Sequence, residues 1–261
     1  LVPVFPGTNC EYESARAVER GGAIADVLVL RTLSPRALEE SLEEFAARLA
    51  KAQMLFLPGG FSNGDEPDGS GKFIAAFLRS PRAADALASL LEVRDGLALG
   101  VCNGFQALVK LGLLPYGRIT EPSAASPALT FNTIGRHQSR IVRTRVASDL
   151  SPWLLRAGVG SIYSCPVSHG EGRFLCTPEL FMELARSGQI AAQYVDGDGN
   201  ASMDILYNPA GSTGAVEAIC SPDGRILGKM GHSERAGNGL YLNVPGTYDM
   251  PLFESAVDYF K

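Results

Sequence analysis

The fold of this chain is decided at Leu97-Ala98-Leu99-Gly100-Val101-Cys102-Asn103-Gly104, where an apolar run ends in a cysteine between glycines. The run predicts a strand, and the residues from Asn103 to Leu111 predict a helix after it. A nucleophile framed by glycines between a strand and a helix is typical of a nucleophile elbow. We therefore predict that Cys102 is a nucleophile; the alternative is a buried cysteine that only packs.

The predicted turn would place the Cys102 thiol at the N-terminus of a helix, where partial positive charge favours the thiolate. A thiol nucleophile also needs a base and an acid that orients the base. The chain has three histidines, and His232 and Glu234 follow a strand-like run at 226–230. Side chains two apart on an extended segment point the same way, so we predict that these two converge on Cys102. The alternative is a surface turn with an incidental histidine.

Strand and helix signals alternate before the elbow. Residues 2–5, 23–30 and 54–57 predict strands, and residues 11–20, 35–50 and 81–93 predict helices. Ser34 is a natural N-cap with Pro35 at the first helical position. Short, continuously apolar strands separated by helices imply a parallel sheet covered on both faces.

The pattern changes after Pro115. Residues 141–146 alternate as an antiparallel strand does, and residues 190–195 and 215–220 predict strands that return to the sheet. Thr177-Pro178 begins a short helix, and a last helix is expected over 251–260. The expected architecture is one α/β domain over residues 1–261, a doubly wound, mostly parallel sheet with antiparallel additions.

Composition restricts the possible functions. The 261 residues are 46% hydrophobic and 20% charged, with a formal net charge of −5. An acidic chain lacks the basic face that nucleic-acid binding needs, and no apolar run approaches the roughly 20 residues of a membrane span. The five cysteines contain no CxxC pair. They predict a reducing, cytoplasmic compartment. The first residue is Leu1 rather than Met and adjoins the first predicted strand, so we expect either a trimmed sequence or a piece of a longer chain.

Pro58-Gly59-Gly60 ends the third predicted strand. Glycines let a backbone N–H approach a ligand closely, so Gly60 and Asn103 could together form an oxyanion hole. An ordinary turn is the alternative.

The loop at 64–71 resembles a phosphate loop only superficially, because Asp65 and Phe73 occupy positions that should be glycine and serine or threonine. We expect a lid or a partner-facing loop there.

Two further groups of residues are candidates for sites. Cys165, His169 and Cys176 could suggest zinc, but no fourth ligand has the spacing of a structural site, so we expect no metal. The segment at 169–173 is either a wall of the site or a solvated turn. The arginines of the segment 136–145 are either a solvated strand face or a contact with another domain.

The chain resembles the class I (triad) glutamine amidotransferases through its elbow and His232-x-Glu234. It is more closely similar to the glutaminase part of phosphoribosylformylglycinamidine synthases, enzymes of purine biosynthesis. That similarity is carried by an ordered set of motifs: Pro6-Gly7-Thr8-Asn9-Cys10, Leu57-Pro58-Gly59-Gly60-Phe61-Ser62, Phe131-Asn132, Pro166-Val167-Ser168-His169-Gly170-Glu171-Gly172, Asn208-Pro209-Ala210-Gly211-Ser212 and Gly231-His232-Ser233-Glu234-Arg235.

The resemblance implies a flavodoxin-like fold and a role for each matched residue. Cys102 would be the nucleophile, His232 the base and Glu234 its orienter. The backbone N–H groups of Gly60 and Asn103 would form the oxyanion hole. Residues expected to form the glutamine-binding wall are Gly59, Phe61, Gln106 and His169. Ser233 departs from the family pattern, since many triad amidotransferases have proline there.

The implied activity is hydrolysis of glutamine through a cysteine thioester, with ammonia passed to a synthetase that amidates formylglycinamide ribonucleotide. No cofactor is expected in this chain, whereas ATP and magnesium are expected in the synthetase. The acidic loop and the tail at 239–246 favour the C-terminal domain of a single-chain synthase. Two alternatives stay open: a DJ-1/PfpI-like cysteine hydrolase, and a non-catalytic assembly or regulatory domain on the same fold.

Overall fold

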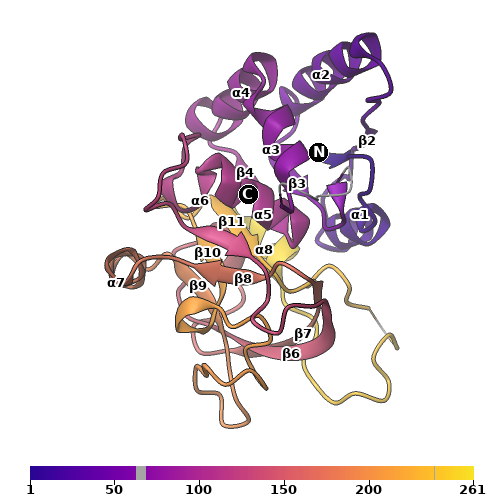
Figure 1. Cartoon of the computed structure of the whole chain (residues 1–261). Coiled ribbons are helices and arrows are strands. Elements are labelled where there is room, and N and C mark those ends of the chain that lie inside the picture. Colours follow the sequence, from indigo (N-terminus) through magenta and orange to yellow (C-terminus); the bar gives the residue numbers. More distant parts are fainter. Residues whose placement is uncertain (63–68, 238) are drawn as a thin grey trace.

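The structure is a computed structural model that describes residues 1–62, 69–237 and 239–261 (Figure 1). Strands and helices alternate along its first part, and strands dominate the second. The elements are β1 (Val2–Val4), α1 (Glu11–Arg20), β2 (Val27–Val29), α2 (Pro35–Leu49), β3 (Met54–Leu57), α3 (Lys72–Arg79), α4 (Pro81–Ala88), η2 (Ser89–Val93), β4 (Leu97–Val101), α5 (Asn103–Leu111), α6 (Leu113–Tyr116), β5 (Ala128–Thr130), β6 (Gln138–Val146), η3 (Pro152–Leu154), β7 (Ile162–His169), β8 (Arg173–Leu175), α7 (Pro178–Arg186), β9 (Ile190–Tyr194), η4 (Thr213–Ala215), β10 (Val216–Cys220), β11 (Ile226–Lys229) and α8 (Leu252–Asp258).

The central sheet has seven strands in the order β3-β4-β11-β10-β9-β6-β7. The pairs β3–β4 and β4–β11 are parallel, and the remaining pairs are antiparallel. The parallel ribbon β1–β2 lies beside β3, where the Phe56 N–H donates to the Leu1 carbonyl at 2.9 Å. The predicted α/β class is confirmed, but four of the six strand pairs are antiparallel, so the sheet is mixed rather than mostly parallel as expected.

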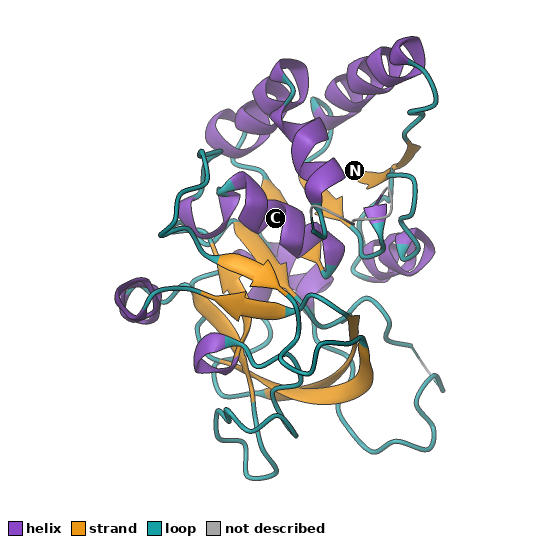
Figure 2. Ribbon diagram, in the orientation of Figure 1, coloured by secondary structure: helices purple, strands orange, loops and turns teal. Residues whose placement is uncertain are grey.

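Helices cover both faces of the parallel half (Figure 2). On one face α3 packs over β1, where the rings of Phe5 and Phe77 meet edge to face at 5.3 Å between centroids. On the other face α8 packs over β3 through Phe56 and Phe253, whose centroids lie 5.5 Å apart. Each such aromatic pair buries a large apolar area, which anchors the helices to the sheet.

Local sequence signals account for several element ends. The Ser34 hydroxyl accepts a hydrogen bond from the Ala37 N–H at 3.1 Å, as its position before Pro35 predicts. The expected helix over 81–93 changes to a π-helix after Ala88. The expected strand over 23–30 is shortened to Val27–Val29, because this edge segment pairs only with the three residues of β1.

The helix α5 lies unusually close to the sheet because glycines face it. A side chain at Gly104 would collide with the Leu57 carbonyl, and one at Gly228 would collide with the ring of Phe105. These close approaches fix the start of α5 against the ends of β3, β4 and β11. The turn at Cys102 is therefore held from three strands.

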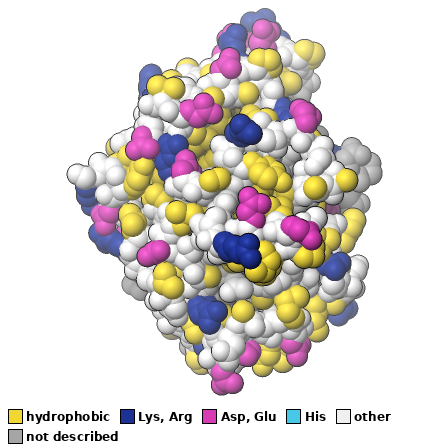
Figure 3. All heavy atoms as spheres, turned by 90° about the vertical axis from the view of Figure 1, so that its left-hand side faces the viewer, with side chains coloured by type: hydrophobic (Ala, Val, Ile, Leu, Met, Phe, Trp, Pro, Cys, Tyr) yellow, Lys and Arg dark blue, Asp and Glu magenta, His cyan; other side chains and the backbone are white. Residues whose placement is uncertain are grey.

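The surface shows no single dominant charge on the face drawn in Figure 3. Basic, acidic and apolar side chains are interspersed there, unlike the continuous basic face that nucleic acid needs. Among the helices of the described residues, none combines the length and apolar character required to cross a membrane.

Candidate active site

Cys102 occupies the sharp turn between β4 and α5. Its backbone has φ 51° and ψ −105°, a region that residues other than glycine seldom adopt. The strain is held by two hydrogen bonds: the Cys102 N–H donates to the Lys229 carbonyl at 2.8 Å, and its carbonyl accepts from the Gln106 N–H at 3.0 Å. Strained residues of this kind mark functional sites when the surrounding structure enforces them. The strand–turn–helix geometry of the predicted elbow is present.

The Cys102 side chain is buried, and its sulfur lies 3.7 Å from the Ser168 carbonyl oxygen. Desolvation raises the pKa of Cys102 to about 12, with a further contribution from the negative charge of Glu234. The Asn103 N–H and Arg235 oppose this shift but do not offset it. The sequence-based expectation of a thiolate stabilised by the helix terminus is therefore outweighed by burial. The resting group is a thiol, and it needs a base.

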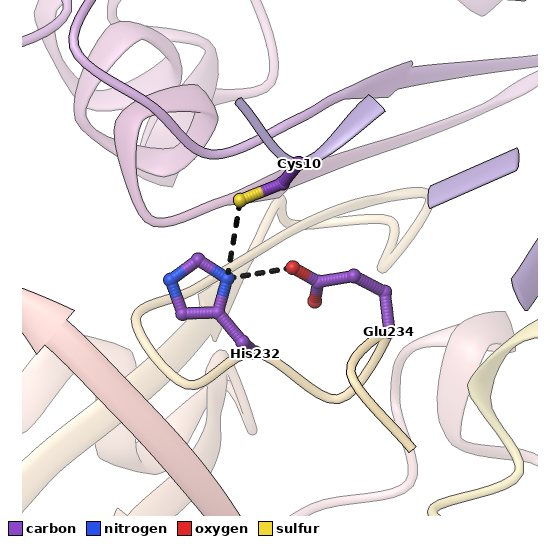
Figure 4. Close-up of side chains that lie close together, drawn as sticks. All are labelled: Cys10, His232 and Glu234. Atoms are coloured by element: carbon purple, nitrogen blue, oxygen red, sulfur yellow. Dashed lines mark hydrogen bonds and ion pairs between the residues drawn. The ribbon is translucent and has the colours of Figure 1, made fainter. Parts of the chain in front are cut away.

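His232 and Glu234 form a buried hydrogen-bonded pair (Figure 4). Their Nδ1 and Oε1 atoms lie 2.6 Å apart, and both side chains are almost fully buried. Burial acts to raise the pKa of Glu234, but His232 and the hydrogen bond to it outweigh burial and lower that pKa. The carboxylate therefore accepts the Nδ1 proton, which leaves Nε2 as the acceptor. Within the described residues Nε2 has no hydrogen-bond partner.

Gly59 lies where the imidazole and the thiol approach each other. A side-chain carbon added at Gly59 would lie 2.7 Å from His232 Cε1 and 3.4 Å from Cys102 Cβ. The absence of a side chain at this position brings the strand end of β3 against both residues. Cys102 and His232, which are far apart in the sequence, therefore both lie against Gly59, as the predicted convergence requires.

Cys10 is a member of this cluster that sequence reasoning missed. Its sulfur lies 3.9 Å from His232 Nδ1 (Figure 4). The same sulfur accepts a hydrogen bond from Arg235 Nη2 at 2.9 Å. Desolvation raises the pKa of Cys10 to about 11. The signal that could have found it is the Pro6–Cys10 motif, whose Thr8 forms a β-bridge with Gly60.

Cys10, His232 and Glu234 also have the composition of a metal site, since their ligand atoms lie within 4.8 Å of one another. Two of these atoms are already joined by the Nδ1–Oε1 hydrogen bond. The third atom, the Cys10 sulfur, contacts the cationic guanidinium of Arg235. The hydrogen bond between His232 and Glu234 and the positive charge beside the sulfur both disfavour a cation at this position.

The two predicted oxyanion donors lie on adjacent segments. The bridge between Thr8 and Gly60 is flanked by hydrogen bonds from Phe61 N–H to Gly7 and from Asn9 N–H to Gly59. The Gly60 N–H is not used in this bridge and finds no acceptor in the part of the chain that the structure describes. Asn103 begins α5, and its Oδ1 accepts from the Ser62 N–H at 3.3 Å. That contact ties the two donor segments together.

Gln106 and Phe61 are two of the residues predicted to line the glutamine-binding site. Gln106 accepts from Asn103 Nδ2 at 3.0 Å and donates to the Glu171 carbonyl at 2.7 Å, so it joins α5 to the loop after β7. Phe61 is half exposed, with its ring 6.3 Å from that of His137. These contacts place Gln106 in a bridging position, where its side-chain amide is engaged at both ends.

His169 is buried at the end of β7, and its Nδ1 lies 3.1 Å from Asn132 Oδ1. Desolvation lowers the pKa of His169 to about 4, and His232 and His137 add to the shift. His169 is therefore neutral at physiological pH. Among the described residues, the ligand atoms of Cys165, His169 and Cys176 do not form a group that could hold a metal ion. The geometry therefore does not support a zinc site made of these three residues.

The expected lid over 64–71 falls mostly outside the described residues, which resume at Gly69. There the Ser70 N–H donates to Glu171 Oε2 at 3.0 Å.

The arginines of β6 donate hydrogen bonds to loops of this same chain. Arg140 donates to the Leu206 carbonyl, and Arg143 donates to the carbonyls of Asp196 and Gly197. In the structure these arginines therefore hold the loops at 196–206.

Comparison with known proteins adds an independent line of information. Residues 1–260 match the CobB/CobQ-like glutamine amidotransferase domain. A protein of Methanococcus maripaludis named phosphoribosylformylglycinamidine synthase subunit PurQ is 33% identical, with 98% of this chain and 96% of the relative covered. A protein of the same name from Synechococcus sp. is 35% identical, with 99% and 96% covered.

The fold has solved counterparts. A structure of PurLQS from Thermotoga maritima contains a chain that superposes with a TM-score of 0.71 at 24% sequence identity. The match covers 100% of this chain and 97% of that chain. At this identity the match supports the fold alone.

Proposed function

The chain belongs to the CobB/CobQ-like glutamine amidotransferase family, and from this membership we propose that it is the glutaminase component of a phosphoribosylformylglycinamidine synthase. Relatives of that name align with it over almost their whole length. Residues 1–261 act as one glutamine amidotransferase domain. The substrate is glutamine, and the product used by the assembly is ammonia.

The partner in this proposal is a synthetase that binds ATP and magnesium and amidates formylglycinamide ribonucleotide in the cytoplasm. It is supplied either as a separate subunit, as in the named relatives, or as a further domain of a longer chain. The named relatives are themselves called subunits of the synthase, which supports a multi-component enzyme. The site of this chain supplies only the glutaminase half-reaction.

The observation that carries the proposal is the strained Cys102 beside the His232–Glu234 pair. His232 Nε2 takes the thiol proton, and the sulfur attacks the side-chain carbonyl carbon of glutamine. The developing oxyanion accepts hydrogen bonds from the Gly60 and Asn103 N–H groups. Glu234 holds the Nδ1 proton and stabilises the imidazolium that forms.

The second half of the reaction returns the proton. The His232 imidazolium protonates the leaving nitrogen, the carbon–nitrogen bond breaks, and ammonia departs from a γ-glutamyl thioester on Cys102. His232 then takes a proton from water, which attacks the thioester. Glutamate is released, and the thiol recovers its proton. Gly59, Phe61 and His169 surround the position that glutamine would occupy, and Gln106 supports it.

Detection of the thioester is the direct test. A glutamine-like electrophile should label Cys102 once per chain, and mass spectrometry of the digested protein locates the label. A labelled Cys102 with glutamine turnover supports the proposal. Labelling without turnover in the complete synthase would favour the assembly domain, and turnover of other amides or esters but not glutamine would favour a DJ-1/PfpI-like hydrolase.

We expect the chain alone to hydrolyse glutamine slowly and the synthetase partner to accelerate it. Uncoupled hydrolysis would release ammonia without an acceptor, so a productive site should form fully only in the assembled, ligand-bound state. The measurement compares glutamate release by this chain alone and with the synthetase, with and without ATP and the acceptor ribonucleotide. Equal and high rates in all states would contradict gating.

Changing Gly59→Ala should lower kcat by about 10-fold or more, because the added carbon would lie 2.7 Å from His232 Cε1. That contact would push the imidazole aside and misplace the base. The matched control is Gly197→Ala, where an added carbon meets nothing within 4 Å. Steady-state rates and melting temperatures of both variants are compared. A Gly59→Ala enzyme with the rate of the wild type would show that the close approach is unimportant.

A further inference from the structure

A buried ion pair lies directly behind the His232 segment. Lys229 Nζ, at the end of β11, lies 3.1 Å from Glu217 Oε1 on the neighbouring strand β10. The side chains are 1% and 0% exposed. Neither residue takes part in the proton transfers described above. Removing two charges from water carries a large desolvation cost, so the pair needs a physical explanation.

The pair holds the residues on both sides of His232, Gly231 through its backbone and Ser233 through its hydroxyl. Lys229 Nζ donates to the Gly231 carbonyl at 2.7 Å and to the Ser233 hydroxyl at 2.9 Å. Glu217 Oε1 accepts from the Gly231 N–H at 2.7 Å. Both residues adjacent to His232 are thus fixed by charge-assisted hydrogen bonds, which are stronger than neutral ones.

The same lysine also contacts the nucleophile segment. Its main-chain carbonyl accepts the hydrogen bond from the Cys102 N–H at 2.8 Å. Lys229 therefore fixes the strained elbow through its backbone and the histidine segment through its side chain. No other acceptor for the Cys102 N–H is present among the described residues.

The space around Gly231 is closed. A side-chain carbon there would collide with the Cys165 sulfur and would lie 2.9 Å from Glu217 Oε1 and 3.1 Å from Lys229 Nζ. Burial acts to lower the pKa of Lys229, but Glu217 and the other acidic neighbours outweigh it and raise that pKa. Lys229 is therefore a cation with fixed partners.

Stability alone explains the pair poorly. Apolar residues of similar volume often replace a buried ion pair with no loss, or with a gain, of folding free energy. We propose, on the basis of the proposed function, that Lys229 and Glu217 are positioning residues that fix the His232 imidazole relative to Cys102. Proton transfer requires that placement, and misplacement by about 1 Å can cost about 10²-fold in rate.

The test uses the assembled synthase with ATP and acceptor, carrying Lys229→Met/Glu217→Leu. We expect the double variant to melt within a few degrees of the wild type or higher, because it removes both buried charges together. The kcat for glutamine should fall by about 10- to 100-fold, with KM changed less than about 3-fold. Labelling of Cys102 by a glutamine-like electrophile should slow by a similar factor.

The matched control is Arg82→Met/Glu43→Gln, which removes an exposed pair with 2.7 Å between Nη1 and Oε1. It should change none of these measurements. If the Lys229/Glu217 double variant fails to fold, Ser233→Ala removes one hydrogen-bond acceptor of Lys229 and should lower kcat by about 3- to 10-fold.

A folded double variant with wild-type kcat, or Ser233→Ala with wild-type kcat where the double variant does not fold, would overturn the inference. A double variant whose KM and melting temperature change while its kcat stays at the wild-type value would also overturn the inference. Absence of glutamine turnover in the wild-type synthase would instead overturn the proposed function. The two failures are therefore distinguishable.

Discussion

Cys102→Ala should lower glutamine hydrolysis by about 10³-fold or more, with the protein still folded. Alanine lacks the sulfur that forms the thioester, and the Cys10 thiol lies against His232 Nδ1 rather than against the Nε2 that takes the proton in the proposed mechanism. The substitution removes one buried atom, and the hydrogen bonds from Cys102 N–H to Lys229 and from Gln106 to the Cys102 carbonyl use only the backbone. The elbow should therefore persist.

The measurement is glutamate release by the assembled synthase, with circular dichroism to verify folding. Ammonia supplied directly should still support amidation of the acceptor, because the synthetase half-reaction does not need the thiol. Cys176→Ser is the control, since Cys176 lies outside the cluster at His232 and is only partly buried. Substantial glutamine turnover by folded Cys102→Ala would show that another group is the nucleophile.

His232→Ala should cost about 10³-fold or more, and Glu234→Ala about 10- to 10³-fold. His232 moves the proton in each step, whereas Glu234 orients it through the 2.6 Å contact with Nδ1. Burial raises the pKa of Cys102 to about 12, so little thiolate forms without the base.

The ranking is measured from kcat of both variants with ammonia-dependent amidation as the internal control for folding and assembly. Glu234→Gln separates charge from geometry, because the amide keeps a similar shape but carries no charge to stabilise the imidazolium. A silent Glu234→Ala together with an essential acidic residue elsewhere would refute the assignment of Glu234.

Local sequence patterns determined the parts of this protein whose cause lies within a few residues. Glycines at 100 and 104 permit the turn at Cys102. The pairing of His232 with Glu234 was predicted from an extended segment, whereas the structure forms a turn there, in which the Arg235 N–H donates to the His232 carbonyl at 3.2 Å. The cap at Ser34 and the class of the fold follow from similarly local rules. These features are set by backbone geometry, which nearby residues control.

Tertiary structure alone decided the electrostatics and the packing partners of the site. The rise in the pKa of Cys102 comes chiefly from burial, which many distant segments create together. Cys10 joins His232 across most of the chain, and Lys229 meets Glu217 only because β11 and β10 pair. Desolvation and hydrogen bonding depend on which distant segments are brought together, and no local pattern in the sequence specifies those contacts.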